Sequence, residues 1–177
     1  VFAVARNPDN SPGLQELMGK YGKQVELIRA DITSHTSVRN LKKSLEGEGL
    51  DQVVIVAGIS GQCQDVAEIT EEDAGNLFMT NAIAPVHLAM ELAPLLRDKG
   101  VLAFLSSIMG SQTCGKSAPM PLYSASKAAL NNLVISWKDS FEHLPFSILL
   151  LHPGWVKTDM GGGAATLSVE DSVSGLL

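Results

Sequence analysis

Short apolar runs that alternate with longer segments of helical character most constrain what this chain can fold into. Each run has about the length of a buried strand, and the runs lie at Val1–Ala5, Val25–Arg29, Val53–Ala57, Val101–Leu105 and Ser147–Leu151. Strands that alternate with helices favour a parallel sheet with helices on its faces, and most of these runs are apolar enough to be buried on both sides. The sequence therefore predicts an α/β fold with a doubly wound parallel sheet.

The segments between these runs carry the signals of helix starts and ends. Ser11-Pro12 is an N-cap and first-turn pair, and Thr70-Glu71-Glu72-Asp73 resembles a capping box. Pro85 and Pro94 predict a kink or a break in the long segment that follows this box. Helices are expected over Ser11–Tyr21, Thr36–Glu48, Glu71–Lys99 and Ser124–His143, with one more capped by Ser168-x-x-Asp171.

Composition excludes several classes of partner. The chain has 177 residues and a net charge of −6, and it has no cluster of Lys and Arg that would neutralise several phosphates of a nucleic acid. No apolar run approaches the roughly 18 residues that cross a bilayer. Two cysteines and four scattered histidines give neither a disulfide framework nor a metal-ligand spacing. We expect one domain over residues 1–177, in a reducing, cytoplasmic compartment, with no nucleic-acid, membrane or metal partner.

Polar or small residues follow each predicted strand, at Arg6, Asp31, Gly58, Ser107 and Pro153-Gly154. In open α/β sheets ligands bind outside the carboxyl ends of the strands, so these positions are candidate binding residues. An arginine in the place of Arg6 accommodates the 2′-phosphate of a dinucleotide, or it is a solvated turn residue. The carboxylate of Asp31 accepts from an adenine amino group, or it caps a turn or the next helix. The residues alone leave both pairs of alternatives open.

Tyr123 and Lys127 form a sharper signal, because residues i and i+4 share one face of a helix. A free phenol has a pKa of about 10, too high for efficient proton transfer near neutrality. A nearby ammonium favours the phenolate and lowers that pKa. The pair is therefore either a general acid and base for an alcohol or alkoxide, or an exposed Tyr–Lys pair without a role.

Taken together, these residues resemble the short-chain dehydrogenase/reductase family. The match rests on Tyr123-x-x-x-Lys127, on Ser107 after the fourth strand, on Asn81 in the long helical segment and on Pro153–Thr158. It extends over almost the whole chain. The stretches SSIMGS, YSASKAALN and LHPGWVKTDMGG look most like the sniffer and C-factor-like branch of carbonyl reductases. The resemblance implies a Rossmann-like fold and hydride transfer between a nicotinamide and a carbonyl or alcohol carbon.

The resemblance also assigns roles to residues. Tyr123 would be the catalytic acid and base, and Lys127 would lower its pKa and hold the nicotinamide ribose. Ser107 would bind the substrate oxygen, and Asn81 would anchor a water that links Lys127 to solvent. The implied cofactor-binding residues are Arg6, Asp31, Ile32, Ala57, Gly58, Tyr123, Lys127, Pro153, Gly154, Val156 and Thr158. Arg6 favours NADP(H) over NAD(H), and the family implies a homodimer or homotetramer.

The chain departs from the family pattern in three places. A glycine-rich turn after the first strand, which lays a pyrophosphate on a helix N-terminus, is absent from the sequence. Ile55-Val56 stands where the family often has two asparagines. Ser107 lies further before Tyr123 than is usual, so Ser111 is the alternative for the substrate-binding serine. We favour Ser107, because it directly follows the strand.

These departures set the expectation for the chain as a whole. The run at Val1 resembles the second strand of the family, and the sequence stops within a helical stretch. We therefore expect a partial dinucleotide-binding domain, a fragment clipped at both ends, that has little or no turnover by itself. The alternative is a catalytically silent nucleotide-binding or signalling protein on the same fold.

Overall fold

The structure, a computed structural model, describes residues 1–114 and 119–176. Its strands are parallel and alternate with helices, which confirms the predicted α/β class with parallel sheets. The chain divides into two compact units, Val1–Gly49 and Leu50–Leu177, each with its own sheet. In the described ranges, no helix is long and apolar enough to cross a membrane.

The first unit is a two-stranded parallel sheet with two helices. Strand β1 (Phe2–Ala5) pairs with β2 (Glu26–Arg29) so that Phe2 lies opposite Glu26. The second helix begins where the hydroxyl of Ser34 accepts the backbone N–H of Ser37. The elements in chain order are β1 (Phe2–Ala5), a 3-10 turn (Pro8–Asn10), α1 (Pro12–Tyr21), a 3-10 turn (Gly22–Gln24), β2 (Glu26–Arg29) and α2 (His35–Ser44).

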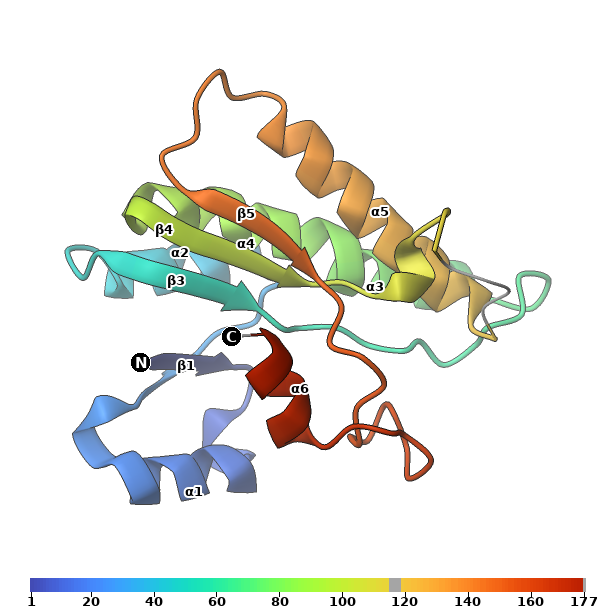
Figure 1. Cartoon of the computed structure of the whole chain (residues 1–177), viewed down its shortest axis with the longest axis horizontal. Coiled ribbons are helices and arrows are strands. Elements are labelled where there is room, and N and C mark those ends of the chain that lie inside the picture. Colours follow the sequence, from blue (N-terminus) through green and yellow to red (C-terminus); the bar gives the residue numbers. More distant parts are fainter. Residues whose placement is uncertain (115–118, 177) are drawn as a thin grey trace. The chain divides into compact units, whose positions relative to one another are not determined.

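The second unit holds a three-stranded parallel sheet in the order β3 (Leu50–Ile55), β4 (Leu96–Leu105) and β5 (Ser147–Leu151). Ile55 pairs with Phe104, and Leu105 pairs with Leu151. The carboxyl ends of the three strands therefore meet at one edge. In Figure 1 the three arrows point the same way, toward the side on which α5 begins.

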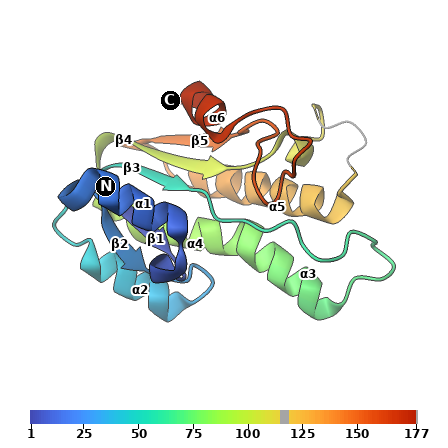
Figure 2. The same ribbon diagram turned by 90° about the horizontal axis from the view of Figure 1, so that it is seen from below.

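Helices cover one face of this sheet. Helix α4 (Ala84–Leu92) packs on β3 and β4 and contacts α5 (Pro121–Lys138). Helix α6 (Val169–Leu176) lies on the opposite side of the sheet (Figure 2). A single π-helical turn, Met79–Ile83, joins α3 to α4. The helices of this unit are α3 (Glu71–Phe78), α4 (Ala84–Leu92), α5 (Pro121–Lys138) and α6 (Val169–Leu176), with 3-10 turns at Ala93–Leu95 and Ile108–Gly110.

The long predicted helix over Glu71–Lys99 is wrong at its C-terminal end. Helix α4 ends at Leu92, a 3-10 turn holds Pro94, and the chain is already a strand at Leu96. Proline cannot donate the hydrogen bond that would continue the helix. The break predicted at Pro94 thus marks the end of the helical segment.

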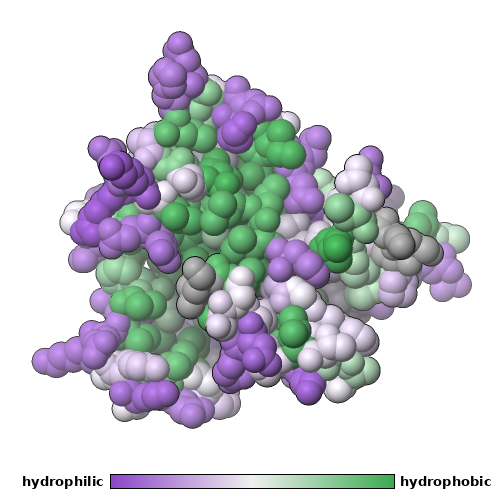
Figure 3. Space-filling view, viewed as in Figure 1, coloured by the Kyte–Doolittle hydropathy of each residue, from purple (hydrophilic) through white to green (hydrophobic). Residues whose placement is uncertain are grey.

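In the sheet of the second unit, the face that holds Leu102 and Phe104 is buried, and the opposite face is exposed at the outer strands β3 and β5 but buried at Ala103 of the central strand. Phe104 and Leu102 are fully buried in the core, whereas Val54 is 52% exposed and Leu149 is 42% exposed. Both exposed residues pair with Ala103 and so point to the same face. Figure 3 shows apolar residues gathered over these strands. The prediction that most strands are buried on both faces is therefore wrong for this sheet.

Candidate active site

Helix α5 carries Tyr123 and Lys127 one turn apart, with the Lys127 Nζ 5.8 Å from the centroid of the Tyr123 ring. The helix starts with Pro121 in its first turn and has no capping side chain of its own. Instead, the Oε1 of Gln64 accepts the backbone N–H of Tyr123 at 3.1 Å. The Nε2 of Gln64 donates to the carbonyl of Ser60 at 2.6 Å. The loop after β3 thus supplies a partner for the open N-terminal end of α5.

The ammonium group of Lys127 is buried at the carboxyl end of β4. Its Nζ donates to the carbonyl of Leu105 at 2.8 Å, and the residue is 3% exposed. Burial disfavours the charged form, and it lowers the pKa of Lys127 from its usual 10.5 to about 8. The side chain is therefore a proton donor poised close to neutral pH.

The environment of Tyr123 moves its pKa in two directions. Burial raises the pKa of the phenol, and a hydrogen bond with the Ser107 hydroxyl lowers it, with burial the larger effect. Lys127 is not among the causes of this shift, and its ammonium donates to the Leu105 carbonyl. That Lys127 lowers this pKa stays a prediction.

Ser107 lies where β4 passes into the 3-10 turn Ile108–Gly110. Its Oγ accepts the backbone N–H of Met109 at 3.2 Å and so caps this turn. The alternative, Ser111, accepts the backbone N–H of Cys114 at 3.1 Å and contacts the Thr113 hydroxyl. Of the two serines, Ser107 is the one whose hydrogen bond lowers the pKa of Tyr123.

Asn81 lies in the π-helical turn and is fully buried. Its Oδ1 accepts the N–H of Ile59 at 2.8 Å, and its Nδ2 donates to the Ile59 carbonyl at 2.8 Å. The same Nδ2 donates to the Oγ of Ser126 at 2.9 Å, and Ser126 in turn donates to the carbonyl of Tyr123. Asn81 therefore joins the loop after β3 to the helix that carries Tyr123 and Lys127.

Gly58 completes this cluster from the end of β3, directly after Ala57. A Cβ at Gly58 would lie 3.3 Å from the Asn81 Oδ1 and 3.3 Å from the Lys127 Nζ. The missing side chain thus leaves a space in front of a buried ammonium. A protonated lysine has three hydrogen-bond donors. The space next to the Lys127 ammonium therefore suits a ligand that carries hydroxyl groups.

The loop after β5 contains Pro153, Gly154, Val156 and Thr158. Gly154 has a φ of +82°, and a Cβ there would collide with the side chain of Leu167. Leu167 also pairs with Val156 as an isolated parallel bridge. The hydroxyl of Thr158 accepts the N–H of Gly161 at 3.1 Å. The segment around Leu167 therefore fixes the shape of this loop.

This loop begins beside the strand end that carries Ser107. The backbone N–H of Ser106 donates to the carbonyl of Leu151 at 2.8 Å. At the other edge of the loop, the Ser172 hydroxyl donates to the carbonyl of Pro153 at 2.7 Å. The second unit thus brings Ser107, Tyr123, Lys127, Asn81 and Gly58 together, with the loop after β5 starting next to them.

Arg6, Asp31 and Ile32 belong to the first unit. Asp31 accepts the N–H of Thr33 at 2.9 Å and its hydroxyl at 2.7 Å. These bonds lower the pKa of Asp31, with a smaller contribution from the charge of Arg6. Asp31 thus caps the turn before α2, which is one of its two predicted roles. Ile32 is half-buried and Arg6 is exposed.

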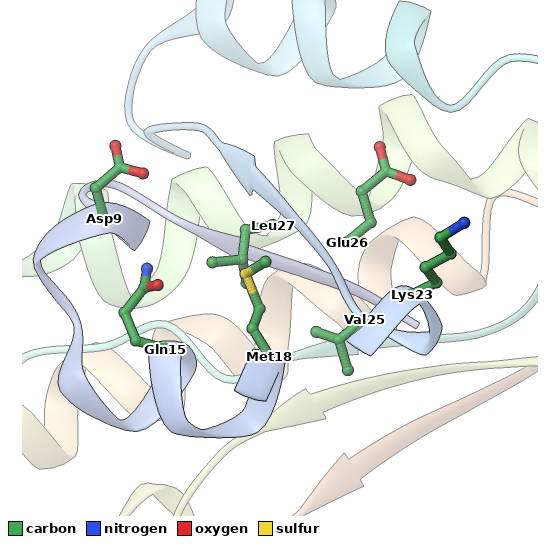
Figure 4. A pocket seen from close by; sticks show the side chains of 7 residues that line it. All are labelled: Asp9, Gln15, Met18, Lys23, Val25, Glu26 and Leu27. Atoms are coloured by element: carbon green, nitrogen blue, oxygen red, sulfur yellow. The ribbon is translucent and has the colours of Figure 1, made fainter. Parts of the chain in front are cut away.

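The first unit also has an open pocket of about 470 Å³ (Figure 4). It is lined by Asp9, Gln15, Met18, Lys23, Val25, Glu26 and Leu27. None of the predicted cofactor-binding residues lines it. Among the described residues, no group of His, Cys, Asp or Glu is placed to hold a metal ion.

Sequence reasoning missed two residues of the cluster, Gln64 and Ser126. Ser126 stands inside the Tyr123-x-x-x-Lys127 motif, so its position carried a signal. Gln64 lies 59 residues before its partner Tyr123. A contact at that separation leaves no local pattern.

The parallel α/β fold with a Tyr–Lys pair at its strand ends is matched by a family model for short chain dehydrogenases over residues 1–166. The chain belongs to the short-chain dehydrogenase family, a family of oxidoreductases. It is 37% identical to the "C-signal" of Myxococcus xanthus over 130 residues, which cover 72% of this chain and 78% of that protein.

Solved structures are similar as well. A carbonyl reductase from Pseudomonas aeruginosa PAO1 in complex with NADP is 53% identical, with a TM-score of 0.91 over 99% of this chain and 77% of that one. The carbonyl reductase Sniffer of Drosophila melanogaster is 26% identical, with a TM-score of 0.84 over 97% of this chain and 75% of that one.

The lowered pKa of Lys127 predicts a specific dependence of stability on pH. Between about pH 8 and 10.5 the unfolded chain binds the proton that folded Lys127 has lost, so the free energy of unfolding rises with pH. The full rise is about 3 kcal/mol. It is measured as the difference in urea unfolding between the wild type and Lys127→Met across this window.

Lys138→Met is the matched control, since Lys138 lies on the same helix with an exposed side chain. A flat difference for Lys127→Met would contradict the lowered pKa.

Proposed function

We propose that the protein is an NADP(H)-dependent carbonyl reductase, which transfers a hydride between a nicotinamide and a carbonyl or alcohol carbon. The proposal rests on two side chains, those of Ser107 and Lys127, that lie near the phenol of Tyr123. The Ser107 hydroxyl lowers the pKa of this phenol, and the Lys127 Nζ lies 5.8 Å from the centroid of its ring. The similar carbonyl reductase from Pseudomonas aeruginosa, which binds NADP, supports the choice of cofactor.

The residues around Gly58 fit the ribose of such a cofactor. The space at Gly58 lies in front of the Lys127 Nζ, whose further donors suit ribose hydroxyls. We assign the loop Pro153–Thr158 to the nicotinamide side, Arg6 to a 2′-phosphate and Asp31 to the adenine side. When bound, the reduced cofactor would supply the hydride.

The side chains of the cluster would handle the proton. Tyr123 would donate its phenolic proton to the substrate oxygen as negative charge develops there. The Ser107 hydroxyl would hold the same oxygen, and the Lys127 ammonium would stabilise the phenolate that remains. Asn81 would anchor a water that links Lys127 to solvent, and the proton that Tyr123 has lost would be replaced through this relay.

A second candidate is a catalytically silent nucleotide-binding or signalling protein. The observation in its favour is the apolar Ile55-Val56 at the end of β3, with Val56 61% exposed. One relative bears the name "C-signal". NADPH oxidation by the native gene product with a reactive carbonyl favours the reductase, and cofactor binding without oxidation favours the silent protein.

We also propose that residues 1–177 form one dinucleotide-binding domain and that the protein assembles as a homodimer or homotetramer in the cytoplasm. Parallel sheets in both units support the first of these. The resemblance to the family supports the assembly.

Replacing Tyr123 by Phe should abolish most of the turnover. The variant lacks the phenolic proton but keeps the ring, so kcat falls about 100-fold or more while the affinity for NADPH stays unchanged. The measurement is NADPH oxidation and NADPH titration on the native gene product.

Tyr21→Phe serves as the control, since Tyr21 is the other tyrosine of the sequence and is exposed. Equal activity of Tyr123→Phe and Tyr21→Phe would show that another group transfers the proton.

Reversing the charge of Arg6 should change the affinity for NADPH much more than the affinity for NADH. Arg6→Asp removes a partner of the 2′-phosphate, so NADPH affinity falls about 10- to 100-fold while NADH affinity changes little. Lys20→Asp, the same charge change on α1, controls for net charge. Titration of both cofactors measures the ratio, and an unchanged ratio would remove the assignment of Arg6.

The polypeptide 1–177 purified alone should turn over little or no substrate. Its sequence contains no glycine-rich turn that would hold the pyrophosphate on a helix N-terminus. Steady NADPH oxidation by this polypeptide with a reactive carbonyl would contradict the expectation.

A further inference from the structure

Two consecutive asparagines on α5 have different environments. Asn131 lies one helical turn after Lys127 and is half-buried, whereas Asn132 is exposed. The function proposed above gives neither of them a role. The difference between them shows that the side chain of Asn131 is engaged with the rest of the fold.

Asn131 contacts both ends of the segment that carries Ser107. The Oγ of Ser106, a buried residue, donates to the Asn131 Oδ1 at 2.6 Å. The Asn131 Nδ2 donates to the carbonyl of Gly110 at 3.3 Å. One amide therefore uses its acceptor on the residue before Ser107 and its donor on the last residue of the turn that Ser107 caps.

Because Gly110 has no side chain, its backbone can approach α5 closely. A Cβ there would lie 2.8 Å from the main-chain carbon of Lys127 and 2.9 Å from the backbone nitrogen of Ala128. Gly110 also donates its N–H to the carbonyl of Ser107 at 2.9 Å. The turn Ile108–Gly110 therefore packs directly against the backbone of α5 at Lys127.

We propose that Asn131 is a positioning residue for the reduction, which holds the segment Ser106–Gly110 on α5 and thereby keeps the Ser107 hydroxyl on Tyr123. This inference rests on the proposed function. Asn131 touches neither the substrate nor the phenol, and it acts through Ser107. It also gives a reason why Ser107 and not Ser111 serves the site, because Ser111 lies just outside the held segment.

The kinetic test compares Asn131→Leu with Asn132→Leu in the native gene product. Asn131→Leu removes both hydrogen bonds, so kcat for a reactive carbonyl should fall about 10- to 100-fold while the affinity for NADPH stays within about twofold. Asn131→Asp keeps an acceptor for Ser106 and should lose less. Asn132→Leu should match the wild type, and equal kcat for both leucine variants would overturn the proposal.

A double variant tests whether Asn131 acts through Ser107. In a Ser107→Ala background, Asn131→Leu should cause no further loss of kcat, because the hydroxyl that it positions is already absent. Losses that multiply would mean that Asn131 acts by another route and would overturn the proposal.

Hydrogen–deuterium exchange separates this inference from the proposed function. The amides of Met109, Gly110 and Ser111 should exchange faster in Asn131→Leu and at the wild-type rate in Asn132→Leu, with circular dichroism confirming that both variants fold. A wild type without reductase activity would overturn the proposed function, and exchange would still decide whether Asn131 holds the segment. Unchanged exchange in Asn131→Leu would overturn the inference even if the wild type is an active reductase.

Discussion

The hydrogen bond from the Lys127 ammonium to the carbonyl of Leu105 is the interaction on which the site depends. Taking an ammonium out of water is costly, and the pKa of about 8 shows that one carbonyl recovers only part of that cost. The bond instead fixes the position of α5, because it joins this helix to the carboxyl end of β4. Tyr123 lies one turn earlier on the same helix, so its distance from the strand ends is set by the same contact.

Three amide side chains complete this attachment, each joining a loop at a strand end to α5 or to its neighbours. Asn81 joins Ile59 to Ser126, Gln64 joins Ser60 to Tyr123, and Asn131 joins Ser106 and Gly110 to the helix. An amide suits this task because it offers a donor and an acceptor a short distance apart, which matches a loop with both N–H and carbonyl groups to satisfy. Among the described residues, no buried side-chain nitrogen or oxygen lacks a partner, so each buried polar side chain around Lys127 has at least one hydrogen bond.

The sequence was sufficient for the features that depend on local pattern. The bounds of β5, the Ser168 cap of α6 and the placement of Tyr123 and Lys127 on one helix follow from periodicity and capping residues. The early start of β4 did not follow, because Leu96 pairs with Leu50 of β3 and the N–H of Lys99 donates to the carbonyl of Pro145, contacts that no local signal encodes. Gln64 and Asn131 were missed for the same reason, since their partners are 59 and about 20 to 25 residues away. The raised pKa of Tyr123 depends on burial, which outweighs the effect of the Ser107 hydroxyl, and the spacing of a motif does not encode burial.

Gly58 and Gly110 both lie next to Lys127, but a side chain at each would meet a different part of it. At Gly58 a side chain would meet the ends of Asn81 and Lys127, at 3.3 Å each, and would fill the space in front of the ammonium. At Gly110 a side chain would meet the main chain of Lys127 at 2.8 Å, which no rotamer change relieves. The second glycine therefore lets the Ser107 turn close on the helix. In the reductase proposed above, a ligand would reach the remaining donors of Lys127 past Gly58, because a Cβ there would meet only the ends of side chains and no backbone.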